Sequence, residues 1–106
     1  MFARSVTIRL KPNVATRFAQ ALEKESMPRL RKQEGFQDQI VFLAPGGREA
    51  VAISLWDLKE NSDAYGRGAY PEVLRAFGDV VEGVPHVRTY EVCHSSFHKI
   101  AAPVAA

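Results

Sequence analysis

Cysteine is nearly absent from this chain, and the one present, Cys93, has no partner for a disulfide within the chain. Long apolar runs are absent as well, since no stretch approaches the ~20 apolar residues that a membrane-spanning helix needs. The first residues also lack the long apolar core of a secretory signal peptide. We therefore expect a cytoplasmic protein that does not cross a membrane.

Neither sign of charge dominates the sequence, which has 14 basic and 12 acidic residues and a formal net charge of +2. This balance argues against nucleic-acid binding, which requires a basic face or stripe. The 46% hydrophobic and 25% charged residues are ordinary values for a globular protein. The length predicts a single domain, which we place at residues 1–98, followed by a frayed tail at residues 99–106.

Histidine is also scarce, and the three histidines have no spacing that is diagnostic of a metal site. His94 and His98 would share one face of a strand but stand ~13 Å apart, too far to share one ion. Cys93 would point to the opposite face. The glycines form no phosphate-binding motif. The sequence therefore predicts neither a metal nor a tightly bound cofactor.

The first third of the chain reads as a strand followed by a helix. Residues 2–10 alternate with period two and predict a strand, one face of which carries Phe2, Arg4, Val6, Ile8 and Leu10. Asn13 is a suitable N-cap for a helix that begins at about Val14. Pro28 must kink or restart this helix, and Gly35 is placed to end it in the left-handed conformation.

Two strands joined by a tight turn come next. The segments 36–44 and 49–56 are strand-like, and residues 45–48 form a turn of hairpin length, so the two strands should be antiparallel. Both faces of the segment 49–56 are apolar or small. An antiparallel strand open to water would alternate more cleanly, so this pattern indicates that something covers each face of the sheet.

A second helical region follows the only tryptophan, Trp56, directly. Asp57 and Glu60 have the spacing of a capping box, which predicts that the helix starts there. This short helix should stop around residues 66–68 and restart at residues 70–72, where a proline suits the first helical turn. Gly83 and Pro85 should end the second helix. The last strand is then expected at about residues 86–97.

The predicted order is strand, helix, strand, strand, helix, strand. This order is the ferredoxin-like βαββαβ arrangement, an α+β sandwich in which helices cover one face of a four-stranded antiparallel sheet. The other face is also partly apolar and needs a cover. Two such faces packed together in a two-fold homodimer provide one.

With this architecture, the chain resembles the dimeric α+β barrel superfamily and, within it, the antibiotic-biosynthesis-monooxygenase-like domains, over about residues 2–97. The resemblance is carried by Gly35 and Phe36, by the strand end at residues 54–57, by Tyr65 and Tyr70, and by residues 85–90. It implies a dimer with an aromatic-lined cavity between sheet and helices. The activities it implies are cofactor-independent oxidation of aromatic polyketides, haem degradation, quinol oxidation and lactone isomerisation.

One of these activities has no support in the residues. The first strand has no asparagine, and residues 58–85 contain no histidine. The haem-degrading members of the superfamily resemble one another in having an asparagine on the first strand and a histidine in the second helical region. The histidine is their haem ligand. The sequence therefore argues against haem degradation.

Five aromatic residues are candidates for substrate binding, because flat apolar rings stack on planar ligands. The same residues could instead form packed core, since aromatic side chains usually dominate burial. They are Trp56, Tyr65, Tyr70, Phe42 and Phe77.

Candidate catalytic residues have no diagnostic spacing. A cofactor-free oxygenase needs a base or hydrogen-bonding group for a substrate anion, and dry walls around the intermediate. His86 and Arg88 at the start of the last strand, together with Tyr70, are the candidates for this role.

Two functions follow from these patterns. The first is a small dimeric monooxygenase-like protein, or an isomerase, acting on a hydrophobic aromatic small molecule without a tightly bound cofactor. The alternative is a non-catalytic dimeric domain that binds a small ligand or serves only for association. A large aromatic cavity favours the first function, and a filled interior favours the second.

Overall fold

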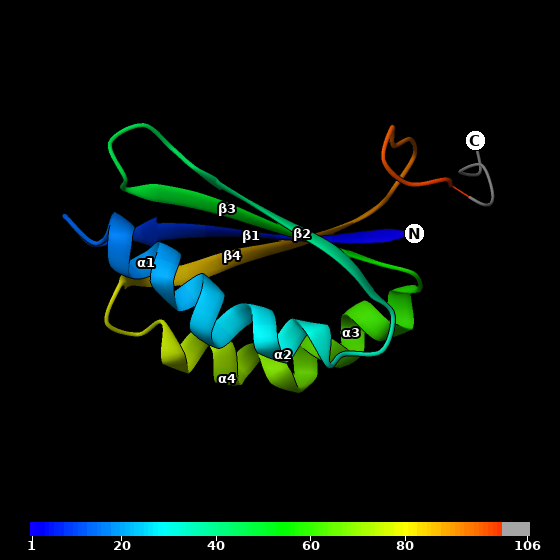
Figure 1. The fold of residues 1–106 in the computed structure, drawn as a ribbon, viewed down its shortest axis with the longest axis horizontal. Helices are drawn as coiled ribbons and strands as arrows, with labels where there is room; N and C mark the ends of the chain where they lie inside the picture. The colour runs from blue at the N-terminus through cyan, green and yellow to red at the C-terminus, as the bar shows by residue number, and fades with distance from the viewer. Residues whose placement is uncertain (101–106) are drawn as a thin grey trace.

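The computed structural model describes residues 1–100. Its elements run along the chain in nearly the predicted order (Figure 1). They are β1 (Phe2–Leu10), α1 (Ala15–Ala21), a π-helical turn (Leu22–Ser26), α2 (Met27–Arg31), β2 (Phe36–Leu43), β3 (Glu49–Trp56), α3 (Lys59–Arg67), α4 (Ala69–Ala76) and β4 (Val81–Glu91).

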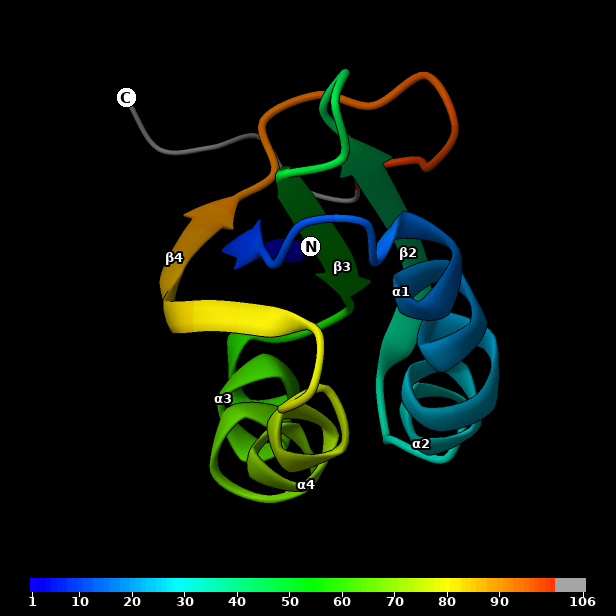
Figure 2. The same cartoon turned by 90° about the vertical axis from the view of Figure 1, so that its left-hand side faces the viewer.

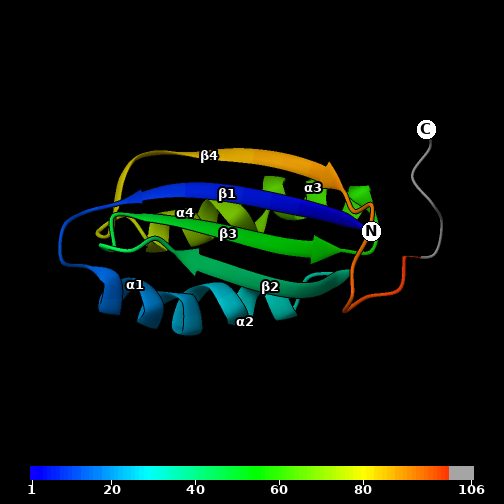
Figure 3. The same ribbon diagram turned by 90° about the horizontal axis from the view of Figure 1, so that it is seen from above.

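The four strands form one sheet in the order β2-β3-β1-β4, and every neighbouring pair is antiparallel (Figure 3). All helices lie on the same side of this sheet, with α1 and α2 beneath the β2 edge and α3 and α4 beneath the β4 edge (Figure 2). The predicted ferredoxin-like α+β sandwich is therefore confirmed.

The alternation of β1 decides which side chains meet the helices. Val6, Ile8 and Leu10 are buried on the helix side, whereas Ser5 and Thr7 point to the side without helices. The apolar residues join Phe18 of α1 and the aromatic and branched residues of α4 in the main core. The sheet and the two helical layers are held together by this burial.

A smaller apolar cluster surrounds the only tryptophan. Trp56 is completely buried with Leu30 and Tyr65, and its indole Nε1 donates a hydrogen bond of 2.9 Å to Ser54 Oγ. The Trp56 ring lies 5.6 Å from that of Phe36 and 5.1 Å from that of Tyr65, measured between centroids. Its polar atom is satisfied, so this site is packed core.

The first helical region differs from the sequence prediction at its start. Asn13 is not the N-cap; it has a φ of 59°, and the helix begins at Ala15 with Val14 as an N-cap that makes no side-chain bond. Asn13 instead adopts the left-handed conformation that asparagine tolerates in turns. The restart at Pro28 is confirmed, since this residue occupies the first turn of α2.

The predicted capping box at Asp57 is wrong. Helix α3 starts at Lys59 with Leu58 as its N-cap, and Asp57 Oδ1 accepts hydrogen bonds from the Leu58 amide at 2.6 Å and from Asn61 Nδ2 at 2.8 Å. The Asp57 amide is bound to the Gly35 carbonyl at 2.9 Å. This bond keeps Asp57 in the strand connection, so the helix begins two residues later.

The boundaries of the last strand were also predicted wrongly. Helix α4 ends at Ala76, and β4 already begins at Val81 and ends at Glu91. Gly83 has a φ of 74°, and the pairing of β1 with β4 shifts register between Thr7 and Arg9. The glycine therefore bends the strand at a bulge instead of ending a helix.

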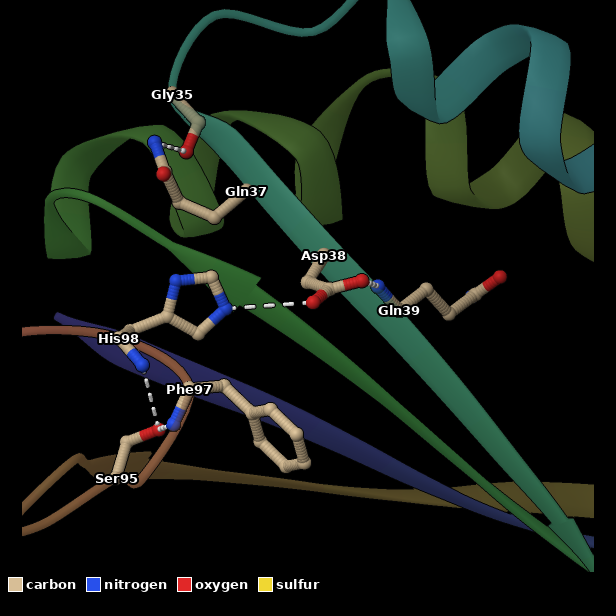
Figure 4. A network of polar contacts seen from close by, with 7 residues as sticks. All are labelled: Gly35, Gln37, Asp38, Gln39, Ser95, Phe97 and His98. Carbon is tan, nitrogen blue, oxygen red and sulfur yellow. Dashed lines mark hydrogen bonds and ion pairs between the residues drawn. The ribbon is translucent and has the colours of Figure 1, made fainter.

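The segment after β4 folds back over the face of the sheet that has no helices. Residues 95–98 lie beside β2, where His98 Nε2 is 3.3 Å from Asp38 Oδ2, and Ser95 Oγ accepts hydrogen bonds from the amides of Phe97 and His98 (Figure 4). Most of the predicted frayed tail, residues 101–106, lies outside the described residues. Among residues 1–100, no helix has the length and apolarity that crossing a membrane requires.

Candidate functional site

A cavity lies between the sheet and the helices. The space that the centre of a water-sized molecule can reach is about 50 Å³, and all of the empty space between the lining residues, including the open mouth, is about 530 Å³. Small side chains of β3, Ala52 and Ser54, form part of its roof. Its floor includes apolar residues of α4, such as Val73, and Phe77, which directly follows this helix. The cavity exists because small residues face the helices there.

Three of the five predicted aromatic residues line this cavity: Tyr65, Tyr70 and Phe77. The rings of Tyr65 and Tyr70 are 6.0 Å apart, edge to face. Trp56 lies behind Tyr65 and is packed on all sides, so it supports the wall without lining it. Tyr65, Tyr70 and Phe77 therefore border the cavity, whereas Trp56 is packed core, and substrate binding by any of them stays a prediction.

The remaining candidates lie on the opposite face of the sheet. Phe42 pairs with Val51 on that face and is 54% exposed. His86 pairs with Thr7 and Arg88 with Ser5, and both side chains are exposed. None of the three contributes to the cavity, because strand alternation turns each of them away from the helices.

Sequence reasoning missed Arg4, which the structure places in the cavity wall. The residue is only 9% exposed, and its guanidinium carbon lies 4.6 Å from the ring centroid of Tyr70 and 5.8 Å from that of Tyr65. Within residues 1–100 no carboxylate forms an ion pair with it. Its Nε is buried without a hydrogen-bond partner. Arg4 is thus a mostly buried cation that lies against two aromatic rings and forms no ion pair with a described carboxylate.

The contacts of Arg4 with the tyrosine rings do not fully compensate the free-energy cost of burying its charge. Removing a guanidinium from water costs several kcal/mol even after relaxation of the surroundings. A cation–π contact returns about 0.5–2 kcal/mol, and an unmade hydrogen bond costs about 1–3 kcal/mol more. The Tyr70 and Tyr65 rings therefore offset only part of the cost of burying Arg4.

Helix α3 is shaped to receive this arginine. A Cβ added to Gly66 would stand 2.7 Å from Nη1 of Arg4, so a larger residue there would require the guanidinium to move. Ser62 lies one helical turn earlier on the same face, and its hydroxyl is also buried without a partner. Of these two unsatisfied polar groups only that of Arg4 belongs to a residue of the cavity lining, where a ligand could satisfy it.

Both cavity tyrosines are protonated at neutral pH. Burial raises the pKa of Tyr65 to about 12, although the nearby Arg4 cation acts in the opposite direction. Burial raises the pKa of Tyr70 as well, again against the effect of Arg4. Their hydroxyls can therefore donate hydrogen bonds to a ligand but are poor general bases.

The other polar residues of the lining are neutral. Ser54 is engaged by Trp56 and by the Arg4 carbonyl, which accepts from its Oγ at 3.5 Å. Ser26, at the end of the π-helical turn, and Gln39 of β2 also face the cavity. Turns of this kind are frequent at functional sites because they displace a side chain from its regular position. No histidine, aspartate or glutamate belongs to the described lining.

The sequence did contain a signal for Arg4. Its position in β1 is on the apolar face of the alternating pattern, between Phe2 and Val6. A charged residue on the inward face of a strand is rarely buried without a partner, so its presence there indicates a function.

Residues 1–100 include no group of three potential metal ligands of the histidine, cysteine, aspartate or glutamate type. His98 meets Asp38 alone, on the side of the sheet away from the cavity (Figure 4). Cys93 is exposed.

No known family model matches this sequence, and no curated protein sequence matches it either. Solved structures do match. A protein of unknown function from Nitrosomonas europaea has a TM-score of 0.74 at 18% identity, covering 95% of this chain and 94% of its own. A protein from Bordetella bronchiseptica, provisionally named as an antibiotic biosynthesis monooxygenase, has a TM-score of 0.73 at 13% identity, covering 86% and 95%. One from Deinococcus radiodurans with the same provisional name has a TM-score of 0.71 at 14% identity, covering 96% and 100%.

These matches establish the fold. The chain has the α+β architecture shared by structures that are named as antibiotic biosynthesis monooxygenases, as its resemblance to that group predicted. Because the identities are low, the likeness is one of fold, and activity has to be argued from the cavity.

Proposed function

We propose that this protein is a small monooxygenase-like enzyme that acts on a hydrophobic aromatic molecule without a tightly bound cofactor. The observation that carries the proposal is the apolar cavity walled by Tyr65, Tyr70 and Phe77. Its fold, shared with structures named as monooxygenases, supports the same interpretation.

The residues of the cavity suit the protein's part in such a reaction. In cofactor-free oxidation the substrate itself supplies the electrons, so the protein must hold the ring, exclude water and stabilise an electron-rich form of the substrate. The aromatic and branched side chains supply a flat, dry surface. The protonated Tyr65 and Tyr70 hydroxyls are hydrogen-bond donors.

Oxygen uptake tests this proposal. The purified protein is first screened by thermal shift with quinones, hydroquinones and planar polyketides, since a ligand at 100 times its dissociation constant adds ~2.7 kcal/mol of stability. The reduced ligands that raise the melting temperature, hydroquinones and polyketides, are then incubated with the protein in an oxygen electrode. We expect substrate-dependent uptake of oxygen.

A pair of matched variants locates that activity. Leu74 lines the cavity and is half-buried, so Leu74→Trp should block it and abolish uptake. Leu58 is 55% exposed and lies outside the cavity lining, so Leu58→Trp should leave uptake unchanged. Equal uptake by the two variants would contradict the assignment of the cavity as the active site.

A non-catalytic ligand-binding domain is the second candidate. The lining favours it in one respect, because the described residues of the cavity provide no histidine or carboxylate as a general base. Ligands that raise the melting temperature without any uptake of oxygen would support this candidate over the enzyme.

We also propose that the protein is a homodimer in the cytoplasm. Ile40 and Phe42 of β2 and Val51, Ile53 and Leu55 of β3 form an apolar stripe on the face without helices. A second copy of this stripe is a complementary cover, because a two-fold axis places like surfaces together. The single exposed cysteine suits a reducing compartment.

A further inference from the structure

We infer that Arg4 binds an anionic oxygen of the ligand, so that the cavity selects small planar molecules with a single negative charge, such as aromatic carboxylates or acidic enols. This inference rests on the proposed function in one respect: the cavity must admit a ligand. It adds the ligand's charge, the residue that recognises it and the selectivity that results.

The first support is the state of Arg4 itself. The residue is 9% exposed, its Nε is buried without a hydrogen-bond partner, and the described residues form no ion pair with it. Arginine carries its charge at every physiological pH, so it cannot escape burial by losing a proton. An anion in the cavity would supply both the missing charge and the missing acceptor.

The second support is the charge of the lining. Arg4 is the one charged side chain among the described residues that line the cavity. One unpaired cation in an apolar site matches one negative charge, and a second negative charge would be left without a partner. The expected ligand is therefore a monoanion.

The third support concerns how the ligand becomes charged. The lining has no histidine or carboxylate, and the pKa values of Tyr65 and Tyr70 are raised, so none of these residues readily removes a proton from a weak acid. A group that is already ionised in water at neutral pH meets this condition. Carboxylates and acidic enols do so, whereas simple phenols do not.

The shape of the site places the charged end of the ligand. Tyr65 and Tyr70 contact Arg4 and also line the cavity, so a bound ring would lie beside them while its anionic oxygen meets the guanidinium. Gly66 gives the guanidinium the room to take this position.

Binding of a matched pair of probes tests the inference. The probes are naphthoate, a planar monoanion, and naphthamide, which has the same ring system and a neutral amide. Dissociation constants are measured by calorimetry at neutral pH for the wild-type protein and for Arg4→Met, Arg4→Lys and Arg75→Met. Arg75 is an exposed arginine of α4 outside the cavity lining and controls for loss of a positive charge.

We expect the wild-type protein to prefer naphthoate. Arg4→Met should weaken naphthoate binding by about 10- to 100-fold, as expected for a hydrogen bond to a charged group, and should leave naphthamide nearly unaffected. Arg4→Lys should restore part of the affinity, because it keeps the charge but not the planar donor pair. Arg75→Met should bind as the wild type does.

Stability separates this role from a purely structural one. An arginine that merely supported the fold would lower the melting temperature when replaced, whereas a buried cation without a partner should give an Arg4→Met variant that is equally stable or more stable. Arg4→Met with intact folding and lost preference for naphthoate would support the inference. A variant that melts early while keeping the preference would contradict it.

The remaining outcomes distinguish the inference from the proposed function. Equal affinity of the wild-type protein for naphthoate and naphthamide would overturn the anion selectivity and leave the cavity as a ligand site. If neither probe bound, and none of the ligands of the thermal-shift screen did so either, the proposed function and this inference would both be overturned.

Discussion

The two faces of the sheet use residue size in opposite ways, and β3 shows this most clearly. Towards the helices it presents Ala50, Ala52 and Ser54 before the buried Trp56, and in the other direction it presents the larger Val51, Ile53 and Leu55. Small residues on the covered face leave the cavity unfilled. Large apolar residues on the uncovered face are partly exposed and gain free energy only if something covers them.

The arginines on the two faces of the sheet also differ in their exposure to water. On the covered face Arg4 is buried against two tyrosine rings, while on the uncovered face Arg9 and Arg88 remain exposed to water. A solvated arginine costs nothing to keep and indicates no function. A buried and unpaired one lowers stability, so its presence points to binding. The comparison supports our proposals that the covered face recognises a ligand and that the uncovered face serves for assembly.

The largest effect should come from the packed end of the covered face. Trp56→Ala should lower the free energy of unfolding by ~3–5 kcal/mol, because the completely buried ring leaves a void and Ser54 loses its donor. Denaturant melts measure this loss. A loss below about 1 kcal/mol would mean that the ring borders empty space instead of packed core.

Alkaline pH should reveal the burial of Tyr65. Its pKa is raised to about 12 in the folded protein from an ordinary value of 10.0, so the unfolded chain loses this proton first as the pH rises. The contribution of this proton to the free energy of unfolding is complete below about pH 10 and is lost as the pH approaches about 12. It amounts to roughly 2–3 kcal/mol. In melts across this window the wild-type protein should lose stability relative to Tyr65→Phe, and parallel curves would count against a buried hydroxyl.

A substitution on the uncovered face should weaken dimerisation and leave the stability of the fold unchanged. Phe42→Asp places a charge in the apolar stripe and, in a two-fold dimer, places two of them near each other. The dimer dissociation constant should rise by at least ~30-fold, or ~2 kcal/mol. Light scattering at micromolar concentration checks this. Val84→Asp, at a position that is 94% exposed on β4 and outside the stripe, serves as the control. A wild-type protein that is monomeric at this concentration would refute the dimer.

The smallest effect should come from one methyl group beside Arg4. Gly66→Ala should weaken naphthoate binding by about 10-fold, or ~1.4 kcal/mol, because the new Cβ displaces Nη1 from its position. Stability should not fall in parallel, since alanine favours a helix over glycine by ~1 kcal/mol. Gly68→Ala lacks any contact with Arg4 and should bind as the wild type does. Equal affinities in the two variants would show that the guanidinium position does not matter.

Hydrophobic periodicity predicted the fold because apolar residues recur at the positions of a strand or helix that face the core. The alternation in residues 2–10 and 49–56 assigned the correct side chains to the two faces of the sheet. Local signals were less reliable. Asn13 and Asp57 look like N-caps, but the backbone around them is held by a left-handed turn and by the bond to Gly35, and no local pattern contains such tertiary contacts.

The candidate site was predicted only in part for the same reason. Tyr65, Tyr70 and Phe77 were recognised as aromatic, yet whether they would line a cavity or fill it depends on Ala52 and Ser54 across the interface. His86 and Arg88 were chosen for their chemistry, and the register of β4 turned them away from the helices. The alternation in residues 2–10 places Arg4 on the inward face of β1, but it does not show that the side chain lies against Tyr65 and Tyr70.

The position of a bound ligand tests the division between the two faces most directly. A crystal structure of the protein soaked with naphthoate should show the ring against Tyr65 and Tyr70 and a carboxylate oxygen within hydrogen-bond distance of the Arg4 guanidinium. Naphthoate bound only on the face without helices, or a cavity that stays empty at saturating concentration while Arg4 remains unpaired, would contradict the account.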